Sequence, residues 1–234
     1  MNQKHLYLSI DFLTVIFPFV FSFYAKANFS KKWKYLWPAI LIPGVIFLVW
    51  DEIFTRLGVW GFNENYLSGV YIGSLPIEEI LFFVCIPYAC VFTYEALKYL
   101  IEEDYFVKIE KSLSIVIILV SAAVGLINYQ KLYTFYTFIS LAIFLLVLRF
   151  KFNQPLSRFY VAYLFLLVPF FIVNGILTGS LTDQPVVWYN DQENLGIRLG
   201  TIPIEDIFYG MLLTLMNVSI FEAIGKKGKG VGIN

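Results

Sequence analysis

Seven apolar segments, each long enough to cross a lipid bilayer as a helix, recur along this chain of 234 residues. A transmembrane helix needs roughly 17–25 mostly apolar residues, because the hydrocarbon core of a bilayer is about 30 Å thick. The segments are Leu6–Ala25, Tyr35–Phe54, Pro76–Leu100, Ser112–Asn128, Tyr133–Arg149, Phe159–Leu177 and Ile202–Ile224. The sequence therefore predicts an all-α integral membrane protein with seven transmembrane helices, and a lipid bilayer as its surroundings.

The composition agrees with this fold class. Hydrophobic residues make up 59% of the chain and charged residues 15%, whereas a soluble domain is nearer half apolar and about a quarter charged. Basic and acidic residues are equal in number, at 17 each, so no positive excess indicates a nucleic-acid partner. The first apolar segment has no clear cleavage site after it, and we interpret it as a span rather than a signal peptide.

The two halves of the chain form an internal repeat. A shift of 127 residues aligns Gly73 with Gly200, and the same shift lays spans one to three on spans five to seven. Span four is left over as a connector. The predicted organisation is a first three-span repeat over 1–110, a connector over 111–132, a second three-span repeat over 133–225, and a flexible basic tail over 226–234.

The connector sets the orientation of the repeats. One extra span between two three-span units keeps both units the same way up, which is the arrangement of a parallel repeat related by an axis along the membrane normal. Equivalent residues of the two repeats should then lie at the same depth. We therefore expect the helix mouths of spans three and seven to be level, and able to contribute to one pocket.

Each of these mouths carries two adjacent acids, Glu78–Glu79 and Glu205–Asp206. A helix cap is the simpler interpretation, because proline at the first helical position and Glu in the first turn both favour helix initiation. A cap needs one acid, however, and ionisable groups in a membrane helix are costly unless they are used. The outer loop is repeated together with the acids, with Trp60 matching Trp188 and Asn63 matching Asn190. We therefore interpret the acid pairs as catalytic.

Other chemistry has little support in the sequence. His5 is the only histidine, and no glycine-rich dinucleotide fingerprint follows a strand, so a Rossmann-type flavin or nicotinamide site is not expected. Ligation of a hard cation by the four paired acids remains an alternative. Glu95 and Glu222 lie about 25 Å farther along their helices and should pair with nearby lysines. Cys85 and Cys90, five residues apart, do not share a helix face, so no disulfide is expected.

Two further acids end span two at the level of the first acid pair. We expect Asp51 to support that pair and Glu52 to be solvated.

Two halves that each carry a Trp- and Asn-containing loop, followed by Pro-x-Glu-Glu or Pro-x-Glu-Asp at a helix mouth, resemble the membrane-integral lycopene cyclases. In some bacteria these enzymes are two small subunits, and in fungi they are a domain fused to phytoene synthase; here both halves are in one chain. The resemblance is strongest over 50–95 and 174–222. The family's acidic motif carries over onto Glu78, Glu79, Glu205 and Asp206.

The resemblance implies a redox-neutral isomerisation of lycopene to γ-carotene and then β-carotene, with no metal or redox cofactor. A proton is added to C2 of an acyclic end, the C5–C6 double bond attacks the cation at C1, and a proton leaves C6. Aromatic rings at the same depth can stabilise the cation, and one or two of the following are expected to do so: Trp60, Phe62, Phe82, Trp188, Tyr189 and Tyr209. Asp51, Asn63 and Asn190 are expected to support the acids.

Other functions fit less well. A seven-helix retinal photoreceptor needs a buried lysine in its last span, and Ile202–Ile224 contains none. A small carrier with its substrate at the repeat interface suits a parallel repeat, but carriers place their coupling groups near the midplane and these acids lie at helix mouths. A cyclase that forms ε rings, or one that acts on C50 carotenoids, remains an alternative to the β-cyclase.

Positive charge gathers in alternate loops, which predicts the topology. The rich segments follow spans one, three, five and seven and contain Lys26, Lys31, Lys32, Lys34, Lys98, Lys108, Lys111, Arg149, Lys151, Arg158, Lys226, Lys227 and Lys229. The other loops contain only Arg56, Lys131 and Arg198. By the positive-inside rule the N-terminus is outside and the C-terminus is in the cytoplasm. The expected location is the inner (cytoplasmic) membrane of the cell.

We therefore expect a reporter fused after Asn234 to be cytoplasmic, and tags in the 63–66 and 191–194 loops to react with an impermeant reagent added outside. A tag in the 105–108 loop, which the same rule places in the cytoplasm, provides the control. Opposite accessibility of the two outer tags would show that the repeat is inverted.

Overall fold

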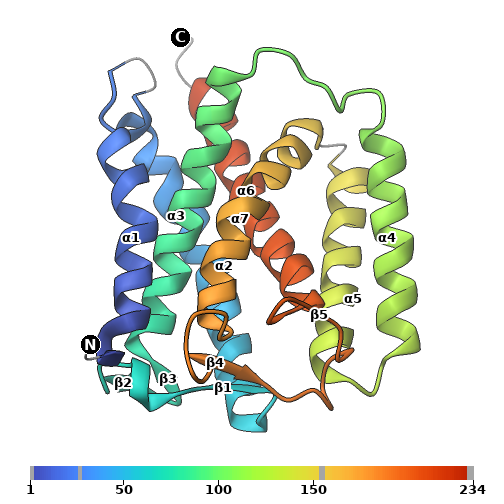
Figure 1. The fold of residues 1–234 in the computed structure, drawn as a ribbon. Helices are drawn as coiled ribbons and strands as arrows, with labels where there is room; N and C mark the ends of the chain where they lie inside the picture. Colours follow the sequence, from blue (N-terminus) through green and yellow to red (C-terminus); the bar gives the residue numbers. More distant parts are fainter. Residues whose placement is uncertain (1–2, 26–27, 153–155, 231–234) are drawn as a thin grey trace. The chain divides into compact units, whose positions relative to one another are not determined.

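A computed structural model describes residues 3–25, 28–152 and 156–230. Its described part contains seven α-helices, which confirms the predicted all-α fold (Figure 1). They are α1 (Leu6–Phe21), α2 (Trp33–Leu57), α3 (Ile77–Leu100), α4 (Glu110–Ile127), α5 (Leu132–Leu146), α6 (Ser157–Leu177) and α7 (Ile204–Gly230).

Within the described residues, six helical segments are long and apolar enough to cross a membrane, which makes this a multi-pass membrane-type chain. They are Phe29–Leu57, Ile77–Leu100, Glu110–Ile127, Leu132–Lys151, Ser157–Leu177 and Ile204–Lys226. The helix α1 is apolar but has only 16 residues, about 24 Å of helix. It ends at Phe21, before the predicted Ala25, and the hydroxyl of the next residue, Ser22, donates to the Pro18 carbonyl at 2.7 Å.

Helices α3 and α7 begin later than predicted. Pro76 and Pro203 do not open these helices but lie in short strands, β3 (Leu75–Pro76) and β6 (Ile202–Pro203), which pair with β2 (Tyr71–Ile72) and β5 (Arg198–Leu199). Proline has no N–H to donate, and the first ladder bond beyond each strand is made by the next residue. Ile77 donates to Val70 at 2.9 Å and Ile204 to Ile197 at 3.0 Å.

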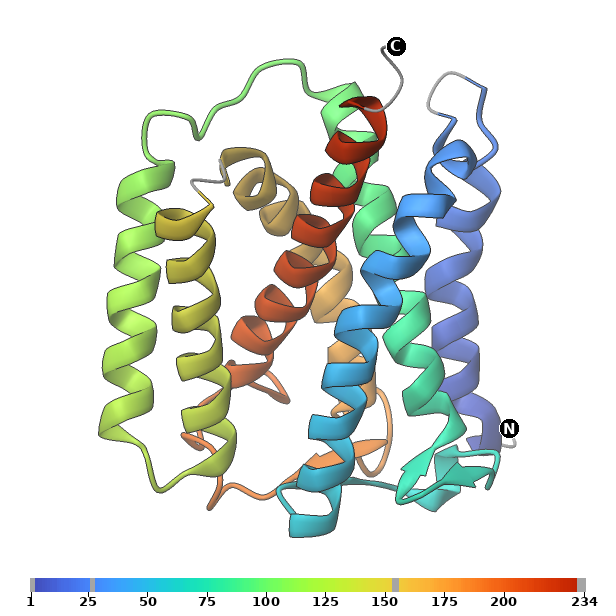
Figure 2. The same cartoon turned by 180° about the vertical axis from the view of Figure 1, so that it is seen from behind.

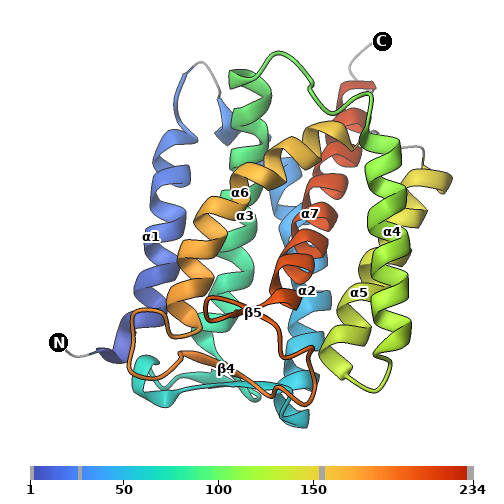
Figure 3. The ribbon, with the colours of Figure 1, turned by 45° about the vertical axis from the view of Figure 1, so that its right-hand side comes forward.

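The two hairpins therefore have the same register and the same closing bond, shifted by 127 residues. Figure 3 shows β5–β6 leading into α7. The repeat seen in the sequence is thus confirmed at the level of single main-chain hydrogen bonds.

The chain forms two compact units. Unit 1 contains Met1–Thr55, Glu64–Leu100 and Leu213–Asn234, and unit 2 contains Arg56–Asn63 and Ile101–Leu212. In unit 1, α1 packs along α3 (Figure 1). In unit 2, α4 packs along α5 (Figure 2). The units do not follow the order of the repeats, because α7 contributes its first part to unit 2 and its second part to unit 1. The predicted boundaries of repeats and connector stay a prediction.

A two-stranded ribbon in unit 2 joins the two tryptophan loops. Strand β1 (Trp60–Phe62) pairs antiparallel with β4 (Val187–Tyr189), and Gly61 lies opposite Trp188. Beyond the strands, Asn63 donates to the Val186 carbonyl and Asn190 to the Val59 carbonyl, both at 2.9 Å. Equivalent residues of the two loops therefore make the same backbone bonds, and the ribbon is symmetric within itself.

At the opposite end of α3, in unit 1, the predicted pairing of glutamates with lysines is confirmed. Glu95 accepts a hydrogen bond from Lys98 at 2.9 Å and another from Lys32. Lys98 also pairs with Glu222. These charges line a pocket of about 370 Å³ together with aromatic rings. Since α7 continues through Gly230, residues 226–230 of the predicted tail are helical. Lys26 and residues 231–234 lie outside the described residues.

The predicted solvation of Glu52 is wrong. Its Oε2 accepts from the backbone N–H of Ser74 at 2.9 Å and from the Ser74 hydroxyl at 2.6 Å. Ser74 and Gly73 form the turn between β2 and β3, and Gly73 has a φ of +68° there. The two bonds to Ser74 therefore fix this turn.

This turn offers a matched pair of variants. Gly73 and its repeat equivalent Gly200 have φ of +68° and +66°, so alanine at either site costs about 1–2 kcal/mol of backbone strain. A Cβ on Gly73 would also lie 2.8 Å from Glu52 Oε1, whereas one on Gly200 meets nothing within 4 Å. We expect G73A to lower the Tm of the detergent-solubilised protein more than G200A does. Equal shifts would show that Glu52 moves away from the new Cβ at no cost in stability.

Candidate functional site

The first centre lies at the start of α3, in unit 1. The Glu78 side chain is completely buried. Its Oε1 accepts from the backbone N–H of Ser68 at 2.7 Å, and its Oε2 has no hydrogen-bond partner in the described part of the chain. Glu79 accepts a hydrogen bond from the Tyr7 hydroxyl, on α1, at 2.5 Å.

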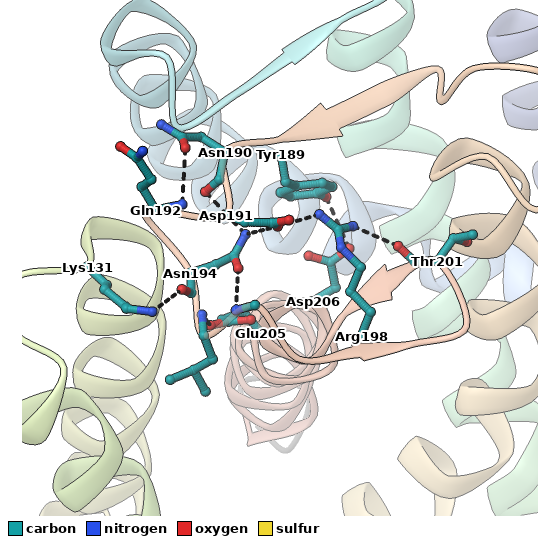
Figure 4. Close-up of polar contacts among 12 residues, drawn as sticks. Lys131, Tyr189, Asn190, Asp191, Gln192, Asn194, Arg198, Thr201, Glu205 and Asp206 are labelled. Carbon is teal, nitrogen blue, oxygen red and sulfur yellow. Dashed lines mark hydrogen bonds and ion pairs between the residues drawn. The ribbon is translucent and has the colours of Figure 1, made fainter.

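The second centre lies at the start of α7, in unit 2. Glu205 is also completely buried, and its Oε1 accepts from the Leu195 N–H at 2.7 Å and the Thr134 hydroxyl at 2.6 Å. Its Oε2, like that of Glu78, has no partner among the described residues. Asp206 accepts from two phenols, that of Tyr133 at 2.5 Å and that of Tyr189, which Figure 4 shows, at 3.0 Å.

The shared bond to a loop amide distinguishes these glutamates from helix caps. In a capping box the Glu bonds a backbone N–H immediately before its own helix. Here each Glu bonds an N–H ten residues earlier, on the far side of the hairpin. In each loop the next residue is a glycine with positive φ, Gly69 at +87° and Gly196 at +70°. One oxygen of each Glu thus fixes the loop, and the other has no hydrogen-bond partner among the described residues.

The second loop is fixed by charged side chains as well. Arg198 pairs with Asp191 at 2.6 Å and donates to the Thr201 carbonyl at 2.8 Å (Figure 4). The hydrogen bond from Arg198 holds the pKa of the Asp191 carboxyl below its ordinary value. Lys131 donates to the Asn194 carbonyl at 2.7 Å. Together these contacts hold the segment from which the Leu195 N–H reaches Glu205.

Aromatic rings gather around Tyr133 in the second centre. The Trp60 ring is buried, and its centroid lies 5.1 Å from that of Tyr133 and 6.2 Å from those of Tyr189 and Tyr209. Tyr133 and Tyr189 stack at 5.8 Å. In the first centre the predicted Phe82 lies edge-on to Tyr7 at 6.2 Å. Four of the six predicted aromatic residues are therefore close to an acid pair. Tyr189 bonds Asp206 itself, and Trp60, Tyr209 and Phe82 contact a tyrosine that bonds an acid.

The other two belong to the ribbon. Trp188 is 42% exposed and its ring covers Gly61, and Phe62 is half-buried opposite Val187. The two predicted asparagines also shape loops. The Asn63 amide donates to Gln184 at 3.1 Å, and the Asn190 side-chain oxygen accepts from the Gln192 N–H at 3.1 Å.

Asp51, on α2 in unit 1, is 2% exposed and interacts electrostatically with Tyr7. This places it beside the first centre, where the sequence predicts it.

The hydroxyl donors were missed by sequence reasoning. Tyr7 and Tyr133 begin spans one and five, where tyrosine is usual at a membrane interface. Their spacing of 126 residues, one less than that of the acid pairs, was the available signal. No sequence motif indicates that Thr134 donates to Glu205. Asp11, a buried acid near the first centre, was also overlooked. No three carboxylate, imidazole or thiol side chains gather at metal-binding spacing among the described residues.

Comparison with known proteins assigns the family. The profile of the lycopene cyclase family matches twice, at residues 4–97 and 130–224. Together the matches cover most of the chain, and each contains one acid pair with the loop that precedes it. No curated protein and no solved structure gave a significant match. With both halves matched around the two centres, this chain belongs to the lycopene cyclase family.

Proposed function

We propose that this protein cyclises the acyclic ends of lycopene to β-ionone rings, through γ-carotene to β-carotene, by redox-neutral acid–base catalysis. Membership of the lycopene cyclase family supports a carotenoid cyclase. The observation that supports the acid–base route is the pair of buried glutamates. Each has one oxygen bonded to a loop amide and the other without a partner among the described residues.

Glu78 and Glu205 are the proton donors in this proposal. A carbon of an alkene has no lone pair, so its protonation needs a carboxylic acid that is positioned and shielded from water. The Oε2 atom of each Glu can carry such a proton, because Oε1 is already an acceptor of the loop N–H. Transfer to C2 leaves the cation at C1, and attack by the C5–C6 double bond closes the ring.

Glu79 and Asp206 are the acceptors of the proton that leaves C6. Both carboxyl groups accept a phenol O–H at 2.5 Å, which is an arrangement that a carboxylate satisfies. Two adjacent carboxyl groups in one apolar site do not both ionise readily, so one acid and one base can coexist in each centre. The proton added at C2 and the proton lost from C6 balance, and the reaction needs no electron carrier.

Aromatic faces are suited to stabilise the cation between these two steps. A ring within about 6 Å of a cation contributes about 0.5–2 kcal/mol without reacting with it. Trp60 is the best placed, since its buried ring contacts Tyr133, Tyr189 and Tyr209.

Expression in a bacterial host that accumulates lycopene tests the proposal. We expect γ-carotene and then β-carotene by pigment chromatography, and the same conversion by detergent-solubilised protein without flavin or nicotinamide. A double variant, Glu78→Gln with Glu205→Gln, is the control for host enzymes. Lycopene that stays unchanged at normal protein levels would refute the cyclase assignment. A strict need for reduced flavin would refute the acid–base route, and ε rings would correct the product.

Single substitutions test the two donors. Gln at position 78 or 205 keeps an oxygen for the loop amide but has no proton to give, so E78Q and E205Q should each reduce cyclisation roughly 100-fold or more. E79Q and D206N should have smaller effects. We expect damage from either half alone, since the sequence predicts one pocket built by both, and this convergence stays a prediction.

Glu103→Gln, on an exposed acid, is the matched control and should be fully active. Normal bicyclic product from both E78Q and E205Q, at equal protein levels, would return these residues to a purely structural role. Normal monocyclic product from one of them would show that the two halves act independently.

A further inference from the structure

Asp11 is a carboxyl group buried inside an apolar helix without a hydrogen-bond partner. It lies on α1 and is 1% exposed, and neither of its oxygens has a partner in the described part of the chain. An unpaired buried carboxylate is strongly unfavourable, so such a group is normally protonated or paired. Acids inside membrane helices are costly and commonly functional.

The position of Asp11 connects it to the first centre. It follows Tyr7 by four residues, so both side chains lie on one face of α1, the helix that packs along α3. Tyr7 bonds Glu79 directly. Asp11 interacts electrostatically with Glu79 and Glu78, and with Cys85 two turns farther along α3. Asp11 therefore extends the first centre from the helix mouth into the span.

The groups around Asp11 favour a stored proton. Those that interact with it are Tyr7 on its own helix and Glu78, Glu79 and Cys85 on α3, and Tyr7 also interacts with Asp51 on α2. None of these groups is a cation. Several carboxyl groups that share an apolar region without a counter-ion cannot all be ionised, and they titrate as a coupled set.

The second repeat shows that the fold does not require an acid here. The offset of 126 that matches Tyr7 with Tyr133 also matches Asp11 with Thr137, whose buried hydroxyl has no partner among the described residues either. The same offset matches Leu8 with Thr134, which donates to Glu205. The first centre thus has an additional carboxyl group where the second has hydroxyl groups. The two centres share a backbone plan but differ in their capacity to hold protons.

We propose that Asp11 is the proton store of the first centre. This rests on the proposed cyclase function. In its protonated form Asp11 gives its proton to the Glu78–Glu79 pair, from which Glu78 protonates C2. The proton released from C6 passes to Glu79 and returns to Asp11, so the cycle is balanced and consumes no proton from water. Asp11 does not contact the substrate in this scheme. It is a positioning residue, which keeps a proton within reach of the two glutamates.

The test uses the full-length protein in detergent, with initial rates of lycopene cyclisation measured between pH 5 and pH 9. Asp11→Asn keeps the size but not the proton, and Asp11→Thr installs the residue that the second repeat tolerates. Both should lose roughly tenfold or more at neutral and alkaline pH. The loss should shrink towards acidic pH, where solvent protonates the glutamates directly. Asp11→Glu should restore most of the rate, and Thr137→Val should match the unmodified protein.

Unchanged rates of both D11N and D11T across the whole pH range would overturn the proposal. So would a loss that is equal at every pH and is not restored by Asp11→Glu, because that pattern belongs to a structural role. In an infrared difference spectrum between the unmodified protein and D11T at neutral pH, a carboxyl C=O band that D11T lacks supports the stored proton without reference to turnover. A difference spectrum without such a band overturns it. If the unmodified protein cyclises no lycopene, the proposed function fails while the infrared comparison still decides the role of Asp11.

Discussion

The hydrogen bond between a loop amide and a buried glutamate, made once in each repeat, is the interaction on which both centres depend. Burial of a carboxyl group is unfavourable unless it is bonded, and the Ser68 and Leu195 amides meet that need for one oxygen of Glu78 and Glu205. The hairpins and the left-handed glycines hold both amides in place, and the Arg198–Asp191 pair also holds the loop of Leu195. Because the amides satisfy only one oxygen, each helix mouth keeps a second carboxyl oxygen without a partner among the described residues.

The two centres differ around this common bond. In the first, Glu79 has the Tyr7 phenol, and the additional acid Asp11 lies near both glutamates. In the second, Asp206 has two phenols and Glu205 has the Thr134 hydroxyl. Hydroxyl donors suit a site that stabilises negative charge, whereas additional acids suit a site that retains protons. Duplication therefore kept the backbone of the site and allowed its side chains to diverge.

Much of the fold could be predicted, because hydropathy over about 20 residues reports directly on membrane spans. The acid pairs were predicted by their repetition and not by any single motif. The strands of Pro76 and Pro203 were not predicted, since two-residue strands leave no periodicity to detect. The roles of Tyr7, Tyr133 and Asp11 depend on which face of one helix meets another, and a uniformly apolar helix gives no sign of its buried face. Glu52 was assigned to solvent because its partner, Ser74, is distant in the sequence.

The ribbon of β1 and β4 has an evolutionary consequence. Its ladder is made by main-chain groups alone, so mutations in either tryptophan loop leave the pairing intact as long as they spare the backbone conformation. Gly61 is the exception, because a Cβ there would lie 2.3 Å from the Trp188 ring. Drift in the two loops is therefore independent at most positions and coupled at this one, where a larger residue requires the Trp188 ring to move or to be replaced.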